Sequence, residues 1–318
     1  MGISFGGTSA LVTPRSDIGL GFDEIDLEAL RGGYVGFQIA PIIEAQVAFG
    51  QFKKLKLAQA LQPRITTRDS NGGFKRIDAE FDVDTFQTVD HGLEMRVDNR
   101  DSAMYAAMID SEMVAGELTR HGVIEGHEQR VIALIDAMGV TASANEFDDS
   151  AADLVADFNA YRQTFRLACG FPPNAMCLDL EIANRLFENA SILELFVGAS
   201  ARTPLEIRLQ GLAAALGLEE IIVSNSVKNT VAAPKAFSLA ATWPVDKALL
   251  FRKSTAATTL VPQFMRTIHW SGNGSRPGCS FEEYEEPQTD GHILRHRLDV
   301  QEKIIYSSMA MVINNVKT

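Results

Sequence analysis

Residues 77–84 form the most regular alternation of apolar and acidic positions in the chain. Their sequence, Ile-Asp-Ala-Glu-Phe-Asp-Val-Asp, puts an apolar side chain at every odd position and a carboxylate at every even one. Successive side chains of a strand point to opposite faces, so this pattern predicts a strand with one apolar and one acidic face. The carboxylates, about 7 Å apart along such a strand, are Asp78, Glu80, Asp82 and Asp84.

The segment before this strand is basic and predicts the other arm of a long hairpin. Asp69 is its only acidic residue, and the run Asp69-Ser70-Asn71-Gly72-Gly73 is a turn signal. A row of carboxylates repels itself, so we expect salt bridges between the two arms. Two interpretations stay open: a solvated hairpin, or a hairpin that pairs with a neighbouring subunit. The basic residues are Lys53, Lys54, Lys56, Arg64, Arg68, Lys75 and Arg76.

The longest helical pattern covers residues 104–138 and would reach about 50 Å as one continuous helix. Glycines at 116, 122 and 126 interrupt it, which predicts a bend or a close approach by another element. The apolar positions expected on its inward face are Met104, Met108, Val114, Leu118, Val131, Leu134, Ile135 and Met138.

A compact α/β region is predicted from residue 150. Its first helix carries Leu154, Phe158, Tyr161 and Phe165 inward and ends at Gly170, before two prolines. Further strands are expected over 175–180, 221–223 and 248–251, and further helices over 181–189 and 204–217. The chain then becomes rich in strands, over 264–270, 279–285, 292–298 and 304–316, and another strand is expected earlier, over 93–97. Residues 1–33 predict an extended arm with one short helix over 23–30.

The bulk composition is that of an acidic globular protein. The chain has 318 residues, 46% hydrophobic and 22% charged, with a net charge of −12. General nucleic-acid binding is disfavoured because that affinity comes from Lys and Arg on phosphates, although an acidic protein can enclose DNA without gripping it. No apolar run approaches the length of a membrane helix, and the first residues do not resemble a secretory signal.

The search for chemistry identifies no catalytic, cofactor or metal residues. His292 and His296 fall on one face of a predicted strand but lack the carboxylate of a zinc-protease motif. The carboxylate row lies in a line rather than around an ion, which argues against calcium. The acidic run Glu282-Glu283-Tyr284-Glu285-Glu286 is expected to be a solvated strand edge. Cys169 and Cys177 are expected to be buried small hydrophobic side chains, and we expect no enzyme.

The order of these parts, and three short strings, resemble a known family. The strings are Gly170-Phe-Pro-Pro-Asn-Ala-Met-Cys-Leu178, Leu216-Gly-Leu-Glu-Glu-Ile-Ile-Val223 and Asp246-Lys-Ala-Leu-Leu-Phe251. With the arm, the charged hairpin and the long helix, they resemble the major capsid protein of tailed bacteriophages, which has the Hong Kong 97-type fold. The resemblance covers nearly the whole chain. Each string is weak evidence alone, but their occurrence in this order is fairly specific to the family.

The resemblance implies an α+β chain of four parts. Residues 1–52 would be the N-arm and 53–98 the extended E-loop. The P-domain, with the long spine helix, would take 99–145 and 262–303, and the α/β A-domain 146–261 and 304–318. The subunits would self-assemble into hexamers and pentamers of an icosahedral virion shell that encloses packaged double-stranded DNA without sequence-specific binding. Assembly would take place in the host cytoplasm and be followed by head maturation.

The resemblance also implies partners and contacts. A portal protein and a separate scaffolding protein are expected, no membrane is expected, and a decoration protein is left open. The inter-subunit contacts expected from the E-loop are Arg64, Arg68, Lys75, Arg76, Asp78, Glu80, Asp82 and Asp84. Lys75 and Asn273 are the pair we would nominate for the covalent cross-link that some members form. Two alternatives remain: an encapsulin-type nanocompartment shell, and, more distantly, an α/β enzyme with a metal at His292 and His296.

Overall fold

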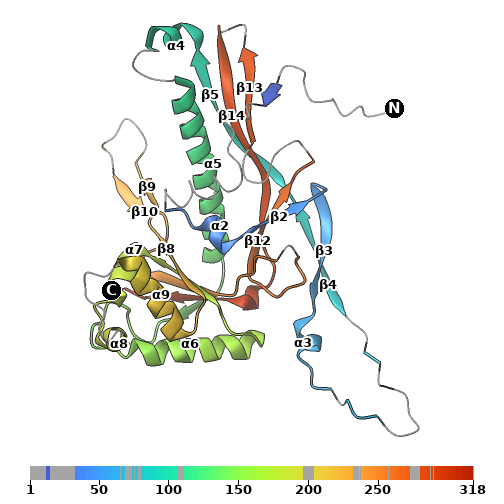
Figure 1. The fold of residues 1–318 in the computed structure, drawn as a ribbon, viewed down its shortest axis with the longest axis vertical. Helices are drawn as coiled ribbons and strands as arrows, with labels where there is room; N and C mark the ends of the chain where they lie inside the picture. Colours follow the sequence, from blue (N-terminus) through green and yellow to red (C-terminus); the bar gives the residue numbers. More distant parts are fainter. Residues whose placement is uncertain are drawn as a thin grey trace. The chain divides into compact units, whose positions relative to one another are not determined.

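The structure is a computed structural model, and its residues group into two compact units (Figure 1). Unit 1 takes 1–49, 87–134 and 267–303, and unit 2 takes 50–86, 135–266 and 304–318. The described residues are 12–14, 33–64, 66–68, 74, 76–77, 80–105, 111–195, 204–231, 236, 238–256, 258–272, 280–286, 288 and 290–317. The short helix expected over 23–30 lies outside them.

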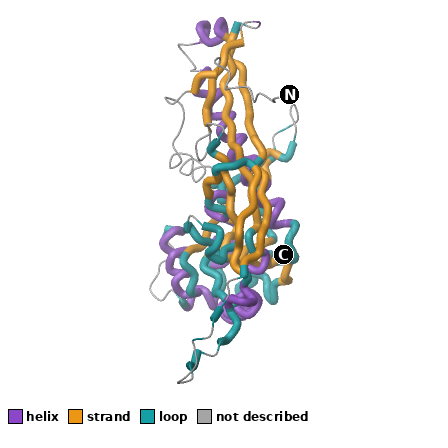
Figure 2. The backbone as a smooth tube through the Cα atoms, turned by 90° about the vertical axis from the view of Figure 1, so that its right-hand side faces the viewer, coloured by secondary structure: helices purple, strands orange, loops and turns teal. Residues whose placement is uncertain are grey.

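Unit 1 is built on a six-stranded sheet beside a long helix, α5 (Ser111–Asp136) (Figures 1 and 2). The strands follow the order β1-β13-β14-β12-β2, with β5 also paired to β14. Beyond these, α2 (Gly36–Ile39) and α4 (Asn99–Tyr105) belong to the unit. The strands are β1 (Val12–Pro14), β2 (Ile42–Ala45), β5 (Val89–Asp98), β12 (Met265–Trp270), β13 (Ser280–Glu286) and β14 (Gly291–Ile304).

The inward face predicted for the long helix is correct only in its second half. Met104 lies in α4 rather than in α5, and it is 62% exposed. Val114 and Leu118 of α5 are 39% and 59% exposed, so these three positions were predicted wrongly, whereas Val131 and Ile135 are buried as predicted. In its first turns the helix buries Ala115 and Thr119 against the sheet in their place. Gly122 fits the predicted close approach, because a Cβ there would collide with the side chain of Leu93.

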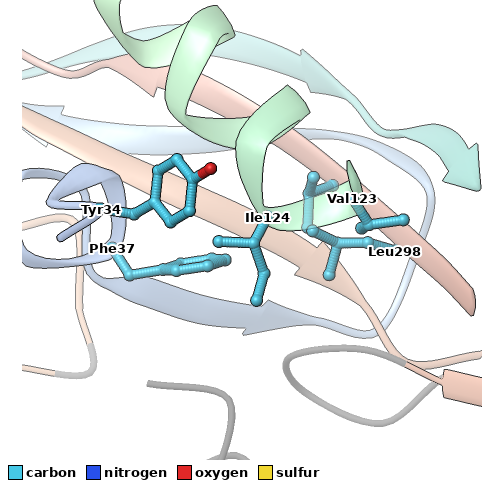
Figure 3. Packing of buried hydrophobic residues seen from close by; sticks show 6 residues of the cluster. Tyr34, Phe37, Val123, Ile124 and Leu298 are labelled. Atoms are coloured by element: carbon cyan, nitrogen blue, oxygen red, sulfur yellow. The ribbon is translucent and has the colours of Figure 1, made fainter. Parts of the chain in front are cut away.

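The core of unit 1 joins α5 to the sheet and to a short turn, residues 34–40, which we call the anchor turn. Tyr34 and Phe37 of this turn pack with Val123 and Ile124 of α5 and with Leu298 of β14 (Figure 3).

The anchor turn is also held by buried polar groups of α5. The Glu128 carboxylate accepts hydrogen bonds from the backbone N–H groups of Val35 (3.0 Å) and Gly36. The ring of His127 stacks on Phe37 with centroids 4.0 Å apart. A Cβ at position 36 would lie 2.7 Å from the Glu128 carboxylate, so only glycine fits this approach.

Unit 2 contains a five-stranded mixed sheet with the order β6-β15-β11-β7-β8. Strand β11 is antiparallel to β15 and β7, whereas β7–β8 and β15–β6 are parallel pairs. The strands are β6 (Val140–Ala142), β7 (Ala175–Asp179), β8 (Glu220–Ser224), β11 (Lys247–Phe251) and β15 (Ala310–Asn314). A separate hairpin pairs β9 (Val227–Asn229) with β10 (Leu239–Ala241).

The helices of unit 2 follow the sequence prediction closely. In α6 (Leu154–Cys169) the side chains of Leu154, Phe158, Tyr161 and Phe165 are buried, as expected. Gly170 ends the helix with a φ of 82°, where glycine is favoured. The others are α7 (Leu180–Leu186), α8 (Ala190–Glu194), α9 (Leu205–Leu216) and the 3-10 helix η2 (Ser307–Met309).

The two tryptophans of the chain fall in different units. Trp243, in unit 2, is 2% exposed, and its indole N–H donates to the Lys247 carbonyl at 3.3 Å. Trp270, in unit 1, donates to the Gln46 carbonyl at 3.3 Å. Among the described residues, no helix combines the length and the apolar character that a bilayer crossing requires.

Candidate functional site

The charged hairpin forms a projection that we call the finger, residues 50–86 of unit 2. Strands β3 (Phe49–Leu55) and β4 (Phe81–Gln87) make a two-stranded sheet, and α3 (Leu57–Ala60) follows β3 (Figure 1). The acidic strand therefore begins at Phe81 rather than at Ile77. The partner strand β3 ends at Leu55 and is followed by α3, so the described residues before Phe81 have no strand beside them with which to form a sheet.

Two salt bridges join the basic and acidic arms, as the sequence predicted. Lys54 Nζ lies 3.4 Å from Asp84 Oδ2, and Lys56 Nζ lies 2.8 Å from Glu80 Oε2. The hydrogen bond from Lys56 to Glu80 and the charge of that carboxylate raise the pKa of Lys56. Glu80 and Asp84, predicted as inter-subunit contacts, thus already have partners within the finger.

The other predicted contact residues divide into three groups. Arg64 donates to the Gln59 carbonyl at 3.0 Å, and the Arg68 guanidinium lies 5.2 Å from the centroid of Phe74. Arg76 and Asp82 are exposed. Lys75 and Asp78 lie outside the described residues, as does Asn273 of the nominated cross-link.

Large apolar side chains of the finger, on β4 and in the residues before it, are exposed rather than buried. Ile77, Phe81 and Val83 are 62%, 42% and 56% exposed, and Phe74 is 75% exposed. Strand β7 of the same unit, in contrast, is buried along its whole length. A projecting group of large apolar side chains is typical of a surface that another protein covers.

The base of the finger is fixed to the rest of unit 2. The Tyr306 hydroxyl donates to the Leu55 carbonyl at 2.7 Å, and the Thr259 hydroxyl donates to the Lys53 carbonyl at 3.1 Å. Burial raises the pKa of Tyr306. The finger is therefore held firmly at its base, while its apolar face is open to solvent.

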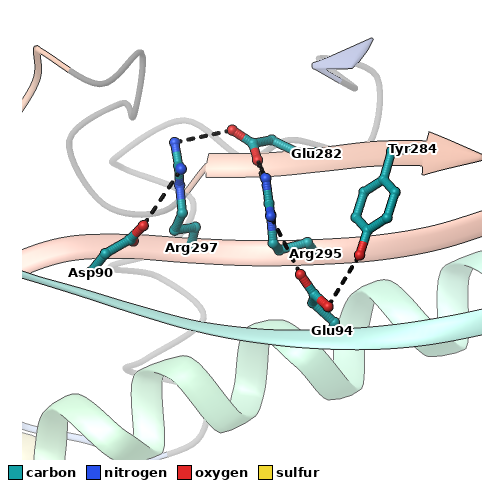
Figure 4. Close-up of polar contacts among 6 residues, drawn as sticks. All are labelled: Asp90, Glu94, Glu282, Tyr284, Arg295 and Arg297. Atoms are coloured by element: carbon teal, nitrogen blue, oxygen red, sulfur yellow. Dashed lines mark hydrogen bonds and ion pairs between the residues drawn. The ribbon is translucent and has the colours of Figure 1, made fainter. Parts of the chain in front are cut away.

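A second charged surface lies on unit 1, across β5, β14 and β13 (Figure 4). Glu282 accepts from Arg295 and pairs with Arg297 at 3.2 Å. Its side chain is only 14% exposed, and β13 lies between β1 and β14. The expectation of a solvated strand edge is therefore wrong for Glu282, because two arginines of the neighbouring strand form ion pairs with it and shield it from solvent.

His292 and His296, the two histidines of the distant metal alternative, each lie against a different partner. His296 Nδ1 lies 2.8 Å from the Thr119 hydroxyl, whereas His292 Nδ1 lies 3.3 Å from Asn99 Oδ1. Burial, and then the nearby charge of Arg120, lower the pKa of His296 to about 3. Within the described part of the chain, no group of three or more His, Cys, Asp or Glu could hold a metal ion. Cys169 and Cys177 are buried, as predicted.

The architecture is that of capsid shell proteins. A crystal structure of a phage-related protein from Bordetella bronchiseptica RB50 matches with a TM-score of 0.62 and 15% identity, over 92% of this chain and 97% of that chain. The capsid of the cyanophage P-SCSP1u matches with a TM-score of 0.55 and 10% identity, over 87% and 86%. The holo-SrpI encapsulin complex from Synechococcus elongatus PCC 7942 matches with a TM-score of 0.50 and 12% identity, over 88% and 86%.

These likenesses confirm the predicted α+β capsid fold of the Hong Kong 97 type at the level of the fold. No protein-family model matches the sequence, and no curated protein matches it either.

Proposed function

We propose that the chain is the major capsid protein of a tailed phage, a subunit that assembles with its own copies into a closed shell around double-stranded DNA. The observation that carries the proposal is the finger, which exposes an apolar face on a firmly held base. A single chain gains nothing from this arrangement, whereas a neighbouring copy that covers the face removes apolar area from water. Capsid proteins are among the solved structures with the same fold.

In the proposed shell, the four parts outlined from the sequence play the roles of N-arm, E-loop, P-domain and A-domain. The arginines of the finger meet acidic groups of an adjacent copy. A single exposed ion pair contributes only about 0.2–1 kcal/mol, but the contact repeats at every subunit and the contributions sum. A portal protein and a separate scaffolding protein are the proposed assembly partners, and the virion is the proposed location.

The direct test is electron microscopy of the purified chain, expressed alone and together with a candidate scaffolding protein. We expect closed particles of uniform size in at least one of the two preparations. An exclusively monomeric chain in both, at concentrations where the fold is intact, would contradict the proposal.

The apolar face can be tested by Phe81→Ser combined with Val83→Ser. We expect the monomer to keep its stability, because both side chains are already exposed, while the particle yield falls. Leu167→Ser is the matched control, since Leu167 is 74% exposed on α6 and lies outside the finger. Normal assembly of the double variant would show that Phe81 and Val83 of the finger take no part in the contact between copies.

The charges can be tested by Arg64→Glu combined with Arg68→Glu. We expect fewer or less stable particles, with a defect that deepens at low salt, where charge repulsion is least screened. Shells of normal yield and thermal stability would show that these arginines make no contact between copies.

An encapsulin-type compartment is the second candidate, favoured by the match to the SrpI encapsulin complex. The two candidates differ in their contents. Nuclease-resistant DNA in particles purified from the native host supports the phage head, whereas a co-purifying enzyme in particles without DNA supports the compartment.

A further inference from the structure

The surface of unit 1 that faces away from α5 carries a charged network on three neighbouring strands. Val97, Leu294 and Phe281 pack with Ala115 of α5, so the side chains of alternate residues on these strands lie on the opposite face. That face carries Asp90 and Glu94 from β5, Arg295 and Arg297 from β14, and Glu282 and Tyr284 from β13 (Figure 4). The ladder places Asp299 of β14 on the same face.

Negative charge exceeds positive charge on this face. Glu282 bonds to both arginines, whereas Asp90 lies 3.5 Å from Arg297 and Glu94 lies 3.4 Å from Arg295. The contacts of the two β5 carboxylates are thus long for charge-assisted pairs. Arg96 and Asp98 of β5 form a pair of their own on this face, at 2.7 Å. The remaining two guanidinium groups, of Arg295 and Arg297, face four carboxylates, those of Asp90, Glu94, Glu282 and Asp299.

Asp299 adds to this imbalance. It lies directly opposite Asp90 in the β5–β14 ladder, at a separation where like charges repel. Asp299 is 4% exposed, and its Oδ1 atom has no hydrogen-bond partner among the described residues. Burial raises the pKa of Asp90, and the charge of Asp299 raises it further, against the opposing effect of Arg297. A buried carboxylate oxygen without a donor leaves the negative charge on this side of the sheet less compensated.

An open cavity of about 380 Å³ lies beside the carboxylates of Asp90 and Glu94. Its lining residues are Asp90, Gly92, Leu93, Glu94, Arg295 and Arg297. Gly92 separates the two β5 carboxylates without a side chain of its own, and a Cβ there would lie 2.9 Å from the His296 carbonyl oxygen. The floor between Asp90 and Glu94 is therefore bare, and both carboxylates can be reached from solvent, being 42% and 46% exposed in their side chains.

We infer that this cavity receives the guanidinium of Arg76 from the finger of a second copy, which would bond to Asp90 and Glu94. The inference rests on the proposed function, because it needs copies that associate. A guanidinium has five N–H donors in a planar fork, which suits two carboxylates on either side of a bare floor. Among the described finger arginines, Arg64 and Arg68 have contacts within their own finger, whereas exposed Arg76 makes no ion pair or hydrogen bond with the described residues.

The test reverses the charges on each side separately. Arg76→Glu alone, and Asp90→Lys with Glu94→Lys, are each expected to lower the particle yield at least tenfold. A chain that combines all three changes restores the charge complementarity and is expected to regain most of the yield. A milder pair, Asp90→Asn with Glu94→Gln, lowers the yield without placing lysines next to Arg295 and Arg297, and circular dichroism confirms that each variant is folded.

Mixing the two defective variants shows whether the contact joins different copies. The glutamate on the finger of the Arg76→Glu variant complements the lysines in the cavity of the Asp90→Lys, Glu94→Lys variant. The Arg76 on the finger of the lysine variant complements the unchanged carboxylates in the cavity of the Arg76→Glu variant. Equimolar mixtures are therefore expected to co-assemble when neither variant assembles alone. Rescue in the triple variant without rescue in the mixture would overturn a contact between copies.

Glu117→Lys is the matched control, because Glu117 is an exposed carboxylate on α5 of the same unit. It is expected to assemble normally. Normal assembly of Arg76→Glu would overturn the role of Arg76 while wild-type particles keep the proposed function intact. Failure of the wild-type chain to form particles under any condition would instead refute the proposed function itself.

Discussion

The finger and the anchor turn use similar charged side chains in opposite surroundings. In the finger, Lys56 forms an ion pair with Glu80, and the two side chains are 47% and 56% exposed. At the anchor turn, Glu128 is 1% exposed and accepts from two backbone N–H groups, and neighbouring His127 is equally buried. Nearby, Glu302 is 6% exposed in its side chain and lies 2.9 Å from Arg130.

The difference in burial decides what each set of charges can do. Exposed pairs exchange readily with water and with other partners, so they add little stability but can be rearranged when a second copy binds. Buried groups have lost their hydration, so their partners cannot be removed without a large cost. We therefore interpret the anchor turn as a fixed part of unit 1 and the finger as the part available for assembly.

The largest expected effect is on the buried pair of unit 1. Glu302→Ala leaves Arg130 without its carboxylate and removes the charge that lies 3.6 Å from His127 Nε2. Truncating one partner of a fully buried pair costs about 3–5 kcal/mol in the free energy of unfolding, and we expect the lower end here because the Arg130 side chain is 29% exposed. Urea denaturation of the unassembled chain, followed by circular dichroism, measures this loss. A loss below about 1 kcal/mol would show that solvent reaches Arg130 more fully than its burial indicates.

The second effect is a pH dependence at Glu128. Burial raises the pKa of Glu128 from 4.5 to about 7, although the N–H groups of Val35 and Gly36 oppose the change. Folding therefore favours the protonated acid, and the stability it contributes is full below pH 4.5 and is lost as the pH rises through 7. At about 1.4 kcal/mol per pH unit between the two pKa values, the contribution spans about 3 kcal/mol.

Glu128→Gln tests this dependence because it keeps an acceptor oxygen and removes the ionisation. We expect the variant to be more stable than the wild type at pH 8 and to gain nothing at pH 4.5. Burial lowers the pKa of His127 from 6.5 to about 4, so His127 destabilises both proteins as the pH falls below 6.5. Comparing the two proteins at each pH cancels this common effect. A pH-independent difference would contradict the raised pKa.

The third effect concerns the close approach at Gly36. Gly36→Ala would place a Cβ 2.7 Å from the Glu128 carboxylate and 2.9 Å from His127 Nδ1. We expect a loss of about 1–3 kcal/mol in the free energy of unfolding, as is usual for overpacking. Gly139→Ala is the matched control, because a Cβ there would meet no described atom within 4 Å. Equal stabilities of the two variants would mean that the anchor turn shifts easily.

The smallest expected effect is at the finger. Lys54→Met removes the ion pair with Asp84, whose side chain is 27% exposed, and the 3.4 Å hydrogen bond to the Ile305 carbonyl, and it keeps most of the aliphatic chain. We expect the unassembled chain to lose about 0.2–1 kcal/mol, within the range of exposed pairs. Thermal unfolding of the monomer measures it. A loss of unfolding free energy as large as that caused by Glu302→Ala would contradict the proposed difference between the exposed charges of the finger and the buried charges of unit 1.

The sequence predicted the parts of the fold that depend on local pattern. The inward side of α6 follows from Leu154, Phe158, Tyr161 and Phe165, because large apolar side chains at helical spacing are buried almost wherever the helix packs. The salt bridges of the finger follow from alternating carboxylates beside a basic arm. Such features need no knowledge of the tertiary contacts.

The parts that could not be predicted depend on tertiary partners. The buried face of α5 carries Thr119, His127 and Glu128, which no hydropathy pattern places inside, because their partners come from distant segments. The network on β13 and β14 was missed for the same reason. Arg295 and Glu282 are cross-strand neighbours only once the register of the sheet is known. The alternation of charged residues along β13 and β14 was the one sequence signal that could have suggested the network.

The placement of Trp243 in unit 2 and Trp270 in unit 1 gives each unit its own fluorescent reporter. Trp243→Phe leaves emission from unit 1 alone, and Trp270→Phe leaves emission from unit 2 alone. The melting of the two units can thus be recorded separately in an otherwise unlabelled chain, and a difference between the two curves would reveal which unit loses its structure first.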